Sequence, residues 1–505
     1  MWRSVLPRRP LAGILALSLA VVLALSTVLA ASATTLIQIN ADPFTNPTSQ
    51  HKTQVEPDTF AWGSTVVVAV QSGRFFDGGA SDIAWSTSTD SGVTWVNGTL
   101  PAITVYVGGP YDRVSDPSVA YDAKHNVWII SSLAIRDDPT LGPVGAAVLA
   151  SRSTDGGLSW GAPVPIYLST PRDFVDKNWT ACDNTSTSPF YGNCYTEFDN
   201  FFQNDRIKMS TSTDGGLNWG APVEPAGHPC GIGGQPLVQP NGTVIVPIDN
   251  CFETGLLAFR STDGGLSWSA PVHVTFIAHH TEQGLRSGAL ISAEMDASGK
   301  VYVVWSDCRF RPTSAGGCFS NDLVMTTSMD GINWTKVTRI PLSGVNSKND
   351  FFIPGLGVDR TTSGSSAHLS LTFYFYPVAG CGFSTCRLSV GNVQSLDGGM
   401  TWGARQQFGT SMQLGWIANT TQGRMVGDYI STSFVSNGMS VPAFELAGPT
   451  TSGNPCDVGS MDCNEATFSV VGGVSAQGPF TRVADEPVYN TQGDHPATTP
   501  INLVR

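Results

Sequence analysis

The segment Ser153-Thr-Asp-Gly-Gly-Leu-Ser-Trp160 carries the most structural information, because the chain repeats it. The same pattern, S-x-D-x-G-x-x-W, begins at Ser88, Ser212, Ser261 and Ser395, and a copy one residue shorter runs from Ser328 to Trp334. We call each copy a box. Within a box, Ser and Asp side chains can accept hydrogen bonds from nearby backbone N–H groups, Gly supplies positive φ, and Trp covers the turn. The boxes therefore predict hairpin turns rather than metal ligands or catalytic groups.

The spacing of the boxes predicts the architecture. Their aspartates lie 65, 59, 49, 67 and 67 residues apart, which is enough for a four-stranded antiparallel sheet with loops. Each unit opens with a strand bounded by turn residues, and seven such openings occur. They are Glu56–Trp62, Asp116–Asp122, Asp176–Trp179, Gly233–Val238, Arg286–Ile291, Phe351–Pro354 and Gly427–Ile430. We predict an all-β fold, a β-propeller of four-stranded antiparallel blades, with seven blades favoured and six as the alternative.

The last unit has no box and offers only three strands, at residues 428–434, 440–446 and 466–471. We expect the N-terminal strand Thr35–Ile39 to supply the fourth and so to close the ring, which removes an exposed sheet edge. The predicted propeller domain then spans residues 35–485, and residues 486–505 form a C-terminal tail.

Composition argues against a nucleic-acid-binding protein and against a chain that is disordered throughout. The chain has 505 residues, a formal net charge of −13 and no stretch rich in Lys and Arg, so nucleic acid is not expected as a partner. Hydrophobic residues make up 41% of the chain, including 13 Trp and 24 Phe, which provides ample material for a core.

The N-terminus has the features of an export signal. Arg3, Arg8 and Arg9 precede an apolar run over residues 11–30, and Ala31-Ser32-Ala33 supplies a cleavage site of small residues. We predict a signal peptide over residues 1–33 and a secreted, extracellular protein with no membrane contact after cleavage. The alternative is an uncleaved segment that anchors the protein at the cell surface.

The cysteines agree with export. There are ten, in five neighbouring pairs, and none has the double C-x-x-C spacing of a zinc site. We expect disulfides rather than metal ligands, no cofactor and no catalytic metal; structural calcium among the loop aspartates is the one open alternative. The pairs are Cys182 with Cys194, Cys230 with Cys251, Cys308 with Cys318, Cys381 with Cys386, and Cys456 with Cys463.

The boxes resemble those of the sialidase (neuraminidase) superfamily and its Asp-box, or BNR-repeat, relatives, over most of residues 35–485. That resemblance implies a propeller that binds its ligand at the central channel. It also implies three arginines that hold the carboxylate of an acidic sugar, an aspartate as acid/base, and a tyrosine nucleophile activated by a glutamate. A neutral phenol suits this attack because the substrate carboxylate would repel a carboxylate nucleophile.

The first unit carries the best match to these roles. The strand Thr65–Arg74 ends in an arginine, an acidic loop follows, and the next strand runs into the first box. The resemblance implies that Arg74 binds the substrate carboxylate and that Asp77 or Asp82 is the acid/base. The position of an earlier family arginine is held by Val55, so the arginine triad is incomplete there.

Later units supply the remaining candidates. Tyr429 opens the last unit as the expected nucleophile, and Glu282, four residues before Arg286, is the candidate for polarising its phenol. Arg286 and Arg309 are the candidates for further carboxylate-binding arginines.

A polar and aromatic segment of the third unit, Asp176-Lys177-Asn178-Trp179, is expected near the channel, where Trp179 would stack on a sugar ring. Asp116 opens the second unit at an equivalent place. If Asp116 and Asp176 face each other across a cleft, an Asp-box endoglucanase-like hydrolase is a third reading.

We therefore predict a sialidase-like glycoside hydrolase, an exo-α-sialidase-like enzyme that removes terminal acidic sugars from glycans. The alternative is a non-catalytic Asp-box propeller that binds glycan or protein at the cell surface, and Val55 together with the extra blade favours it. We expect a glycan or glycoconjugate partner and a monomer.

Overall fold

A computed structural model of the protein describes residue 1, residues 34–312 and residues 318–489. The predicted signal peptide beyond residue 1 and the tail beyond residue 489 lie outside the described residues. Within the described part, strands dominate, and the helices are short 3-10 turns at Val105–Val107, Phe201–Gln203, Gly364–Ser366 and Leu414–Trp416. None of these described helices has the length and apolar character needed to cross a bilayer. The predicted all-β class is confirmed.

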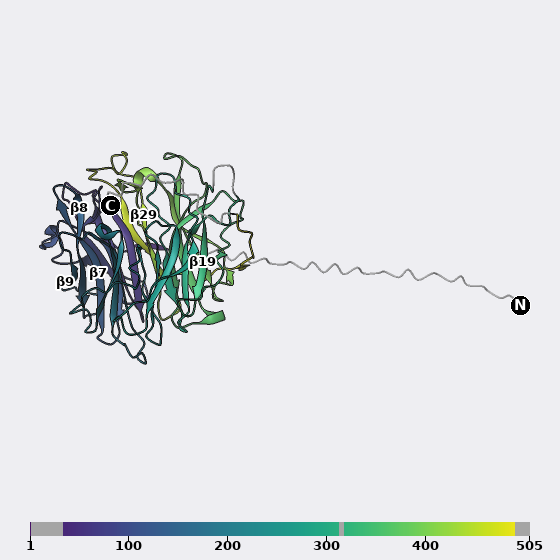
Figure 1. Ribbon diagram of the computed structural model, residues 1–505. Coiled ribbons are helices and arrows are strands. Elements are labelled where there is room, and N and C mark those ends of the chain that lie inside the picture. The colour runs from purple at the N-terminus through teal and green to yellow at the C-terminus, as the bar shows by residue number, and fades with distance from the viewer. Residues whose placement is uncertain (2–33, 313–317, 490–505) are drawn as a thin grey trace. The chain divides into compact units, whose positions relative to one another are not determined.

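The described strands form a β-propeller in which antiparallel sheets follow one another along the chain (Figure 1). Five sheets are separate blades of three or four strands. The first is β10 (Val175–Cys182), β11 (Cys194–Asn200) and β12 (Arg206–Ser212). The second is β13 (Leu237–Val238), β14 (Val244–Asp249), β15 (Gly255–Ser261) and β16 (Val272–Phe276). The third is β17 (Ser292–Met295), β18 (Val301–Asp307), β19 (Asp322–Ser328) and β20 (Thr338–Arg339). The fourth is β21 (Asp350–Val358), β22 (Leu369–Tyr376), β23 (Arg387–Ser395) and β25 (Gln406–Gln413). The fifth is β28 (Ser431–Phe434), β29 (Ser440–Ala447), β30 (Glu465–Val470) and β1 (Leu36–Gln38).

The remaining large sheet has eight strands. Its first half is β2 (Gln54–Trp62), β3 (Thr65–Arg74), β4 (Ala80–Ser88) and β5 (Val96–Thr99). Its second half is β6 (Arg113–Asp122), β7 (Val127–Asp138), β8 (Gly142–Ser153) and β9 (Val164–Leu168), of which β7, β8 and β9 are labelled at the left of Figure 1. Two-stranded ladders pair β24 (Thr401–Trp402) with β31 (Thr481–Arg482), and β26 (Asn419–Thr420) with β27 (Gly423–Arg424).

The number of blades corrects the prediction of seven, or six, equal four-stranded blades. The described residues form five separate blades, and two four-stranded halves are fused into the eight-stranded sheet through the single residue pair Ala80–Val114. In addition, the sheet of β10, β11 and β12 has three strands, because the segment that follows makes two isolated bridges to β12, Met209 with Val223 and Arg206 with Cys230, instead of a fourth strand. Hydrogen bonding between units, which the repeat does not encode, accounts for the difference.

Closure by the N-terminal strand is confirmed. β1 pairs antiparallel with β30, so that Leu36 lies opposite Val470 and Gln38 opposite Phe468. This pairing covers the outer edge of the last blade.

The boxes form the predicted turns. In the second box, the Ser153 hydroxyl accepts a hydrogen bond from Gly157 N at 2.9 Å, and Asp155 Oδ1 accepts from the backbone N–H groups of Leu158 and Ser159 at 3.1 and 3.0 Å. The side-chain hydrogen bond from Ser159 and these backbone contacts lower the pKa of Asp155 to about 2. Asp155 is thus committed to its own turn, as the predicted structural role requires.

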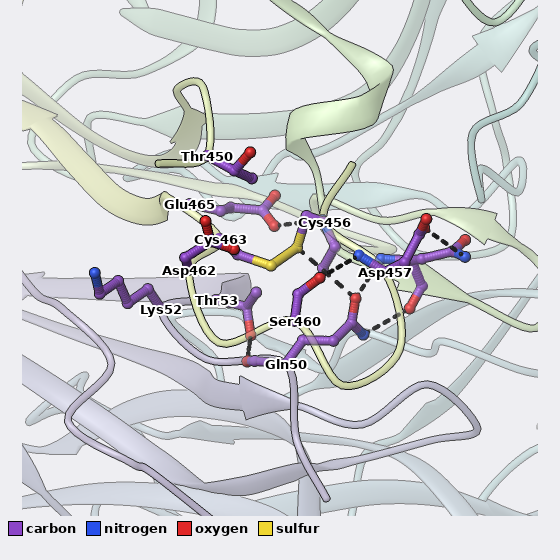
Figure 2. Close-up of a disulfide and its surroundings, with 12 residues drawn as sticks. Gln50, Lys52, Thr53, Thr450, Cys456, Asp457, Ser460, Asp462, Cys463 and Glu465 are labelled. Carbon is purple, nitrogen blue, oxygen red and sulfur yellow. Dashed lines mark hydrogen bonds between the residues drawn. A yellow bond between two sulfur atoms is a disulfide. The ribbon is translucent and has the colours of Figure 1, made fainter. Parts of the chain in front are cut away.

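All five predicted disulfides are present. Figure 2 shows Cys456–Cys463, whose loop joins distant parts of the chain. Ser460 accepts a hydrogen bond from His51 N at 3.0 Å, and Glu465 N donates to the carbonyl of Lys52 at 3.0 Å. These hydrogen bonds hold the segment before β2 against the loop and the first residue of β30.

Candidate active site in the central channel

Three inner strands carry the same irregularity close to their first residues. The pairing of β2, β6 and β10 with their neighbours slips by one residue, and at each slip one non-glycine residue has left-handed backbone: Glu56 (φ 59°), Asp116 (φ 47°) and Lys177 (φ 52°). β21 repeats the feature at Ile353 (φ 48°). Non-glycine residues rarely adopt this conformation, and such strain tends to gather at functional sites.

The three bulges bring charged side chains together. Lys177 Nζ lies 3.4 Å from Asp116 Oδ1 and 4.0 Å from Glu56 Oε1. The same ammonium group donates a hydrogen bond to Asp428 Oδ2. All four side chains are buried, and they come from four different blades or blade halves, so they meet where the inner strands converge in the central channel.

Asp428 is held by a second cation. The guanidinium of Arg286 donates from Nε to Oδ1 at 2.8 Å and from Nη2 to Oδ2 at 2.5 Å. Before Asp428 in the chain, Gly427 (φ 148°) lets the backbone pass close to Glu56, because a Cβ there would lie 2.8 Å from Glu56 N. A bidentate, charge-assisted pair of this kind is both strong and oriented.

Arg74 is the third cation. Its Nη1 donates to Gln71 Oε1 at 3.0 Å and to the carbonyl of Gly79 at 3.1 Å, while the buried Nε has no hydrogen-bond partner among the described residues. Gln71 in turn donates to Glu56. Burial and the nearby Arg286 lower the pKa of Arg74 to about 10.

The carboxyl groups of the cluster have pKa values shifted in opposite directions. Burial and the neighbouring Asp116 and Asp428 raise the pKa of Glu56 to about 8. Burial likewise raises the pKa of Asp116. Although burial opposes it, contact with Arg286 and Lys177 holds the pKa of Asp428 far below its usual range. At neutral pH the cluster therefore contains an ionised Asp428 beside a protonated Glu56.

Tyr429 lies next to this cluster. Its hydroxyl donates to the carbonyl of Pro117 at 3.0 Å, and its ring meets Trp179 edge to face with centroids 5.1 Å apart. Burial, followed by the carboxyl groups of Glu56 and Asp116, raises the pKa of Tyr429 well above its usual value.

Two small cavities border the cluster. One of about 40 Å³ is lined by Glu56, Arg74, Asp116, Lys177 and Arg286 among others, and one of about 20 Å³ by Asp116, Lys177, Trp179 and Tyr429 among others. A water molecule needs roughly 10–15 Å³ of such space, so both cavities fit water but not a sugar ring. A substrate would have to displace side chains to enter.

The structure brings together seven of the residues predicted from the sequence. They line one or both of the two cavities: Arg74, Asp116, Asp176, Lys177, Trp179, Arg286 and Tyr429.

The two predicted acid/base candidates lie outside the cluster. Asp77, with 42% of its side chain exposed, pairs with Arg113 in a separate surface groove. Asp82 is buried in β4, lines neither cavity, and its carboxylate oxygens have no hydrogen-bond partner among the described residues. Their positions on the loop and on the middle strand, rather than on an inner strand, keep them from the channel.

Glu282 and Arg309 are also placed elsewhere. Glu282 accepts hydrogen bonds from Ser287 and from Asn321 Nδ2, the latter at 2.6 Å, and does not line the cavity that Tyr429 lines. Arg309 is committed to Asp307 at 2.7 Å and to Thr275 at 3.1 Å. After burial, Glu56 rather than Glu282 is the carboxyl group that contributes most to raising the pKa of Tyr429.

Val55, which stands where the first family arginine is expected, is buried and packs against Ala418 and Met425. β2 therefore carries an apolar residue where the arginine is expected, and the next residue along the strand is the acidic Glu56.

Sequence reasoning did not single out Glu56, Gln71 or Asp428 as site residues. A signal for Glu56 is present in the chain, because Glu56-Pro57 in β2 repeats Asp116-Pro117 in β6 at the equivalent place. In the described part of the chain, no group of three His, Cys, Asp or Glu side chains is arranged to hold a metal ion.

Fold and site together define an all-β propeller with box turns and a charged cluster in its channel. No protein-family model matches the chain. A curated sialidase from Bacteroides fragilis (strain YCH46) is 28% identical over 164 residues, a match that covers 27% of this chain and spans 28% of the length of that relative. The predicted resemblance to the sialidase superfamily is confirmed by this match.

Solved structures with a similar arrangement were also found. A protein of unknown function from Dyadobacter fermentans DSM 18053 has 16% identity and a TM-score of 0.45, covering 72% of this chain and 99% of that one. The leech intramolecular trans-sialidase has 13% identity and a TM-score of 0.43, covering 67% of each chain. The intramolecular trans-sialidase from Ruminococcus gnavus has 14% identity and a TM-score of 0.41, covering 87% of this chain and 99% of that one.

Proposed function

We propose that the protein is a sialidase-like glycoside hydrolase that removes terminal acidic sugars, such as sialic acid, from glycans. The observation that carries this proposal is the convergence of three cations, Arg74, Lys177 and Arg286, with protonatable carboxyl groups and Tyr429 in the central channel. A cationic pocket beside an acid and a nucleophile is the chemistry that cleavage of an acidic sugar needs.

The cations would hold the sugar carboxylate. Asp428 now occupies Arg286 and Lys177 with a carboxylate of its own, at the geometry that a substrate carboxylate would use. Substrate binding would therefore replace one carboxylate by another and leave the buried cations paired. The free Nε of Arg74 offers a further donor.

Glu56 is the best-placed general acid. Its pKa of about 8 keeps it protonated near neutral pH, which is the state needed to donate a proton to the leaving oxygen. Asp77 and Asp82 do not line the channel, so the acid role passes to Glu56 in this proposal.

Tyr429 would form the bond to the anomeric carbon while the glycosidic C–O bond breaks. Its phenol proton would pass to Asp116, which lines the same cavity as Tyr429, and the proton of Glu56 would go to the leaving oxygen. Water would then hydrolyse the glycosyl–tyrosine bond, and return of the protons would restore the site. The raised pKa of Tyr429 means that this phenol needs such a base.

An aryl α-sialoside that releases a fluorophore tests the proposal, with the purified protein and the variants Tyr429→Phe and Glu56→Gln. We expect turnover by the parent protein and a loss of at least about a hundredfold in kcat in each variant. Tyr191→Phe, at a tyrosine that lines neither cavity, is the matched control and should keep full activity. No turnover by the folded parent protein would overturn the proposal.

A second function is supported by the way the cations are already occupied. Asp428 neutralises Arg286 and Lys177, the adjoining cavities fit only water, and Val55 removes one arginine. These features favour a non-catalytic propeller that binds glycan or protein at the cell surface. Saturable binding of a sialylated glycan without turnover would support this alternative.

We also propose that the protein is secreted and acts as a monomer. The five disulfides support folding in an oxidising compartment. Mass spectrometry of the protein recovered from the medium would identify the mature N-terminus and test cleavage after residue 33; retention with the cells would favour an anchor.

A further inference from the structure

A larger cavity, of about 320 Å³, lies at the opposite end of the inner strands. In β2 the charged cluster sits at Glu56, whereas the cavity is lined by Asp58 to Phe60 and by Trp62 at the last residue of the strand. Ala61 pairs with Val66, and Val66 pairs with Ser88, the first residue of a box. The cavity is therefore at the box end of the channel, and the cluster is at the other end.

Aromatic side chains provide the apolar part of its wall. Trp62 is 40% exposed, and Phe60 and Trp179 contribute further ring surface. Trp179 also lines the 20 Å³ cavity beside Tyr429, so the two cavities share this residue. Aromatic rings next to polar groups suit the apolar faces and hydroxyl groups of a sugar.

The charges in the wall select against an anion. Arg360 is the one cation in the described lining, and its guanidinium stacks on Phe60 at 4.4 Å and donates to Glu294 at 3.1 Å. The acidic residues Asp58, Glu294 and Asp296 outnumber it. A ligand carboxylate would meet these acids and would have to compete for Arg360, whereas carboxylate and amide groups can bind neutral hydroxyls directly.

We propose that this box-end cavity is a binding site for a neutral saccharide. Its volume is within the range of roughly 300–1,000 Å³ that small-ligand sites have, in contrast to the water-sized cavities at the cluster. Glu294, with a carboxylate at the cavity wall, would accept hydrogen bonds from sugar hydroxyls, and Trp62 would pack on the ring. The site does not depend on the glycosidase activity proposed for the other end.

The test is a titration of the full-length protein with lactose and cellobiose as neutral probes and 3′-sialyllactose as the acidic one. Tryptophan fluorescence and saturation-transfer NMR report binding, because Trp62 and Trp179 line the cavity. We expect saturable binding of at least one neutral disaccharide. Trp62→Ala and Glu294→Gln should each weaken it by about tenfold or more, since truncating a central aromatic contact commonly has that effect.

Three controls keep the result interpretable. Phe252→Ala removes an exposed aromatic residue that does not line the cavity and should bind as the parent does. Tyr429→Phe should also retain neutral-sugar binding, which separates this site from the cluster. Unchanged thermal unfolding of Trp62→Ala would show that its fold is intact.

Absence of saturable binding by both neutral probes would overturn the proposal, as would binding that Trp62→Ala and Glu294→Gln leave unchanged. Tighter binding of 3′-sialyllactose than of lactose, lost in Trp62→Ala, would likewise contradict the proposed preference for neutral sugars.

Discussion

Asp428 and Arg286 form a two-point ion pair, with hydrogen bonds of 2.8 Å from Nε and 2.5 Å from Nη2. Lys177 donates to the same carboxylate from a different blade. One carboxylate thus pairs with two cations, and the electrostatics of the channel depend on it.

Asp428→Ala should therefore destabilise the protein strongly, because Arg286 loses its counter-ion and the buried Lys177 keeps only the longer contact with Asp116 at 3.4 Å. We expect the free energy of unfolding to fall by about 3–5 kcal/mol, measured by urea denaturation. A small carboxylate such as acetate should restore part of the loss in Asp428→Ala but not change the parent. Equal stability of the two proteins would show that the pair has no such role, and Asp485→Ala, with 88% of its side chain exposed, is the neutral control.

Stability should fall as pH rises from about 4 to 8. Burial is the main cause that raises the pKa of Glu56 to about 8, of Asp58 and Asp350 to about 7, and of Asp42 to about 6. In this interval the unfolded chain has released protons that the folded protein still binds, so each unit of pH favours unfolding. Below this interval these groups are protonated in both states and contribute no further slope.

Thermal unfolding across that pH range measures the effect. Glu56→Gln should make the decline between about pH 5 and 8 shallower, because it removes the group with the highest of these pKa values. Asp485→Asn should leave the slope unchanged. A parent protein that gains stability steadily up to pH 8 would contradict the burial of these acids.

The box aspartates should have a measurable but modest structural role. Asp155→Ala removes the acceptor for Leu158 N, Ser159 N and the Ser159 hydroxyl in an exposed turn. We expect a loss of about 1–2 kcal/mol in the free energy of unfolding and no change in ligand binding. A large loss of binding with intact folding would instead indicate that this box has a direct functional role.

Among the disulfides, Cys456–Cys463 should matter more for stability than Cys381–Cys386. Its loop accepts hydrogen bonds from His51 and Arg424, and both of its cysteines are buried. Replacing Cys456 and Cys463 by Ala should cost about 2 kcal/mol or more by chemical denaturation. The double Ala variant at Cys381 and Cys386 is the matched comparison, and a larger loss there would contradict the expected order.

The box turns and the disulfides could be predicted from the sequence because each depends on residues that lie close together in the chain. The box turns rest on side chains two to four residues apart, such as Ser153, Asp155 and Gly157, and the cysteine pairs close short loops. The pairing of β1 with β30 followed from counting strands in a unit that lacked one. The pair Ala80–Val114, which fuses two blade halves, depends on how neighbouring units pack, and no repeat pattern reports it.

The same distinction applies to the candidate site. Arg74 and Lys177 could be predicted because they lie in strands, β3 and β10, that the sequence marks. Arg286 and Tyr429 were placed at the starts of predicted strands, but in the structure these segments precede β17 and β28. Glu56 and Asp428 were missed because their roles arise from a backbone bulge and from contact between blades.

The pairing of β1 with β30 also governs the order in which the chain can fold during synthesis. Residues 36–38 leave the ribosome early, whereas their partner strand, residues 465–470, follows only after more than four hundred further residues. Until then the earlier blades can form in sequence, but β1 has no partner strand, because β30 has not yet been synthesised. The emerging protein therefore carries an unpaired strand near its N-terminus for nearly the whole of translation. Because unpaired strand edges are prone to aggregation, this strand needs protection until β30 is available.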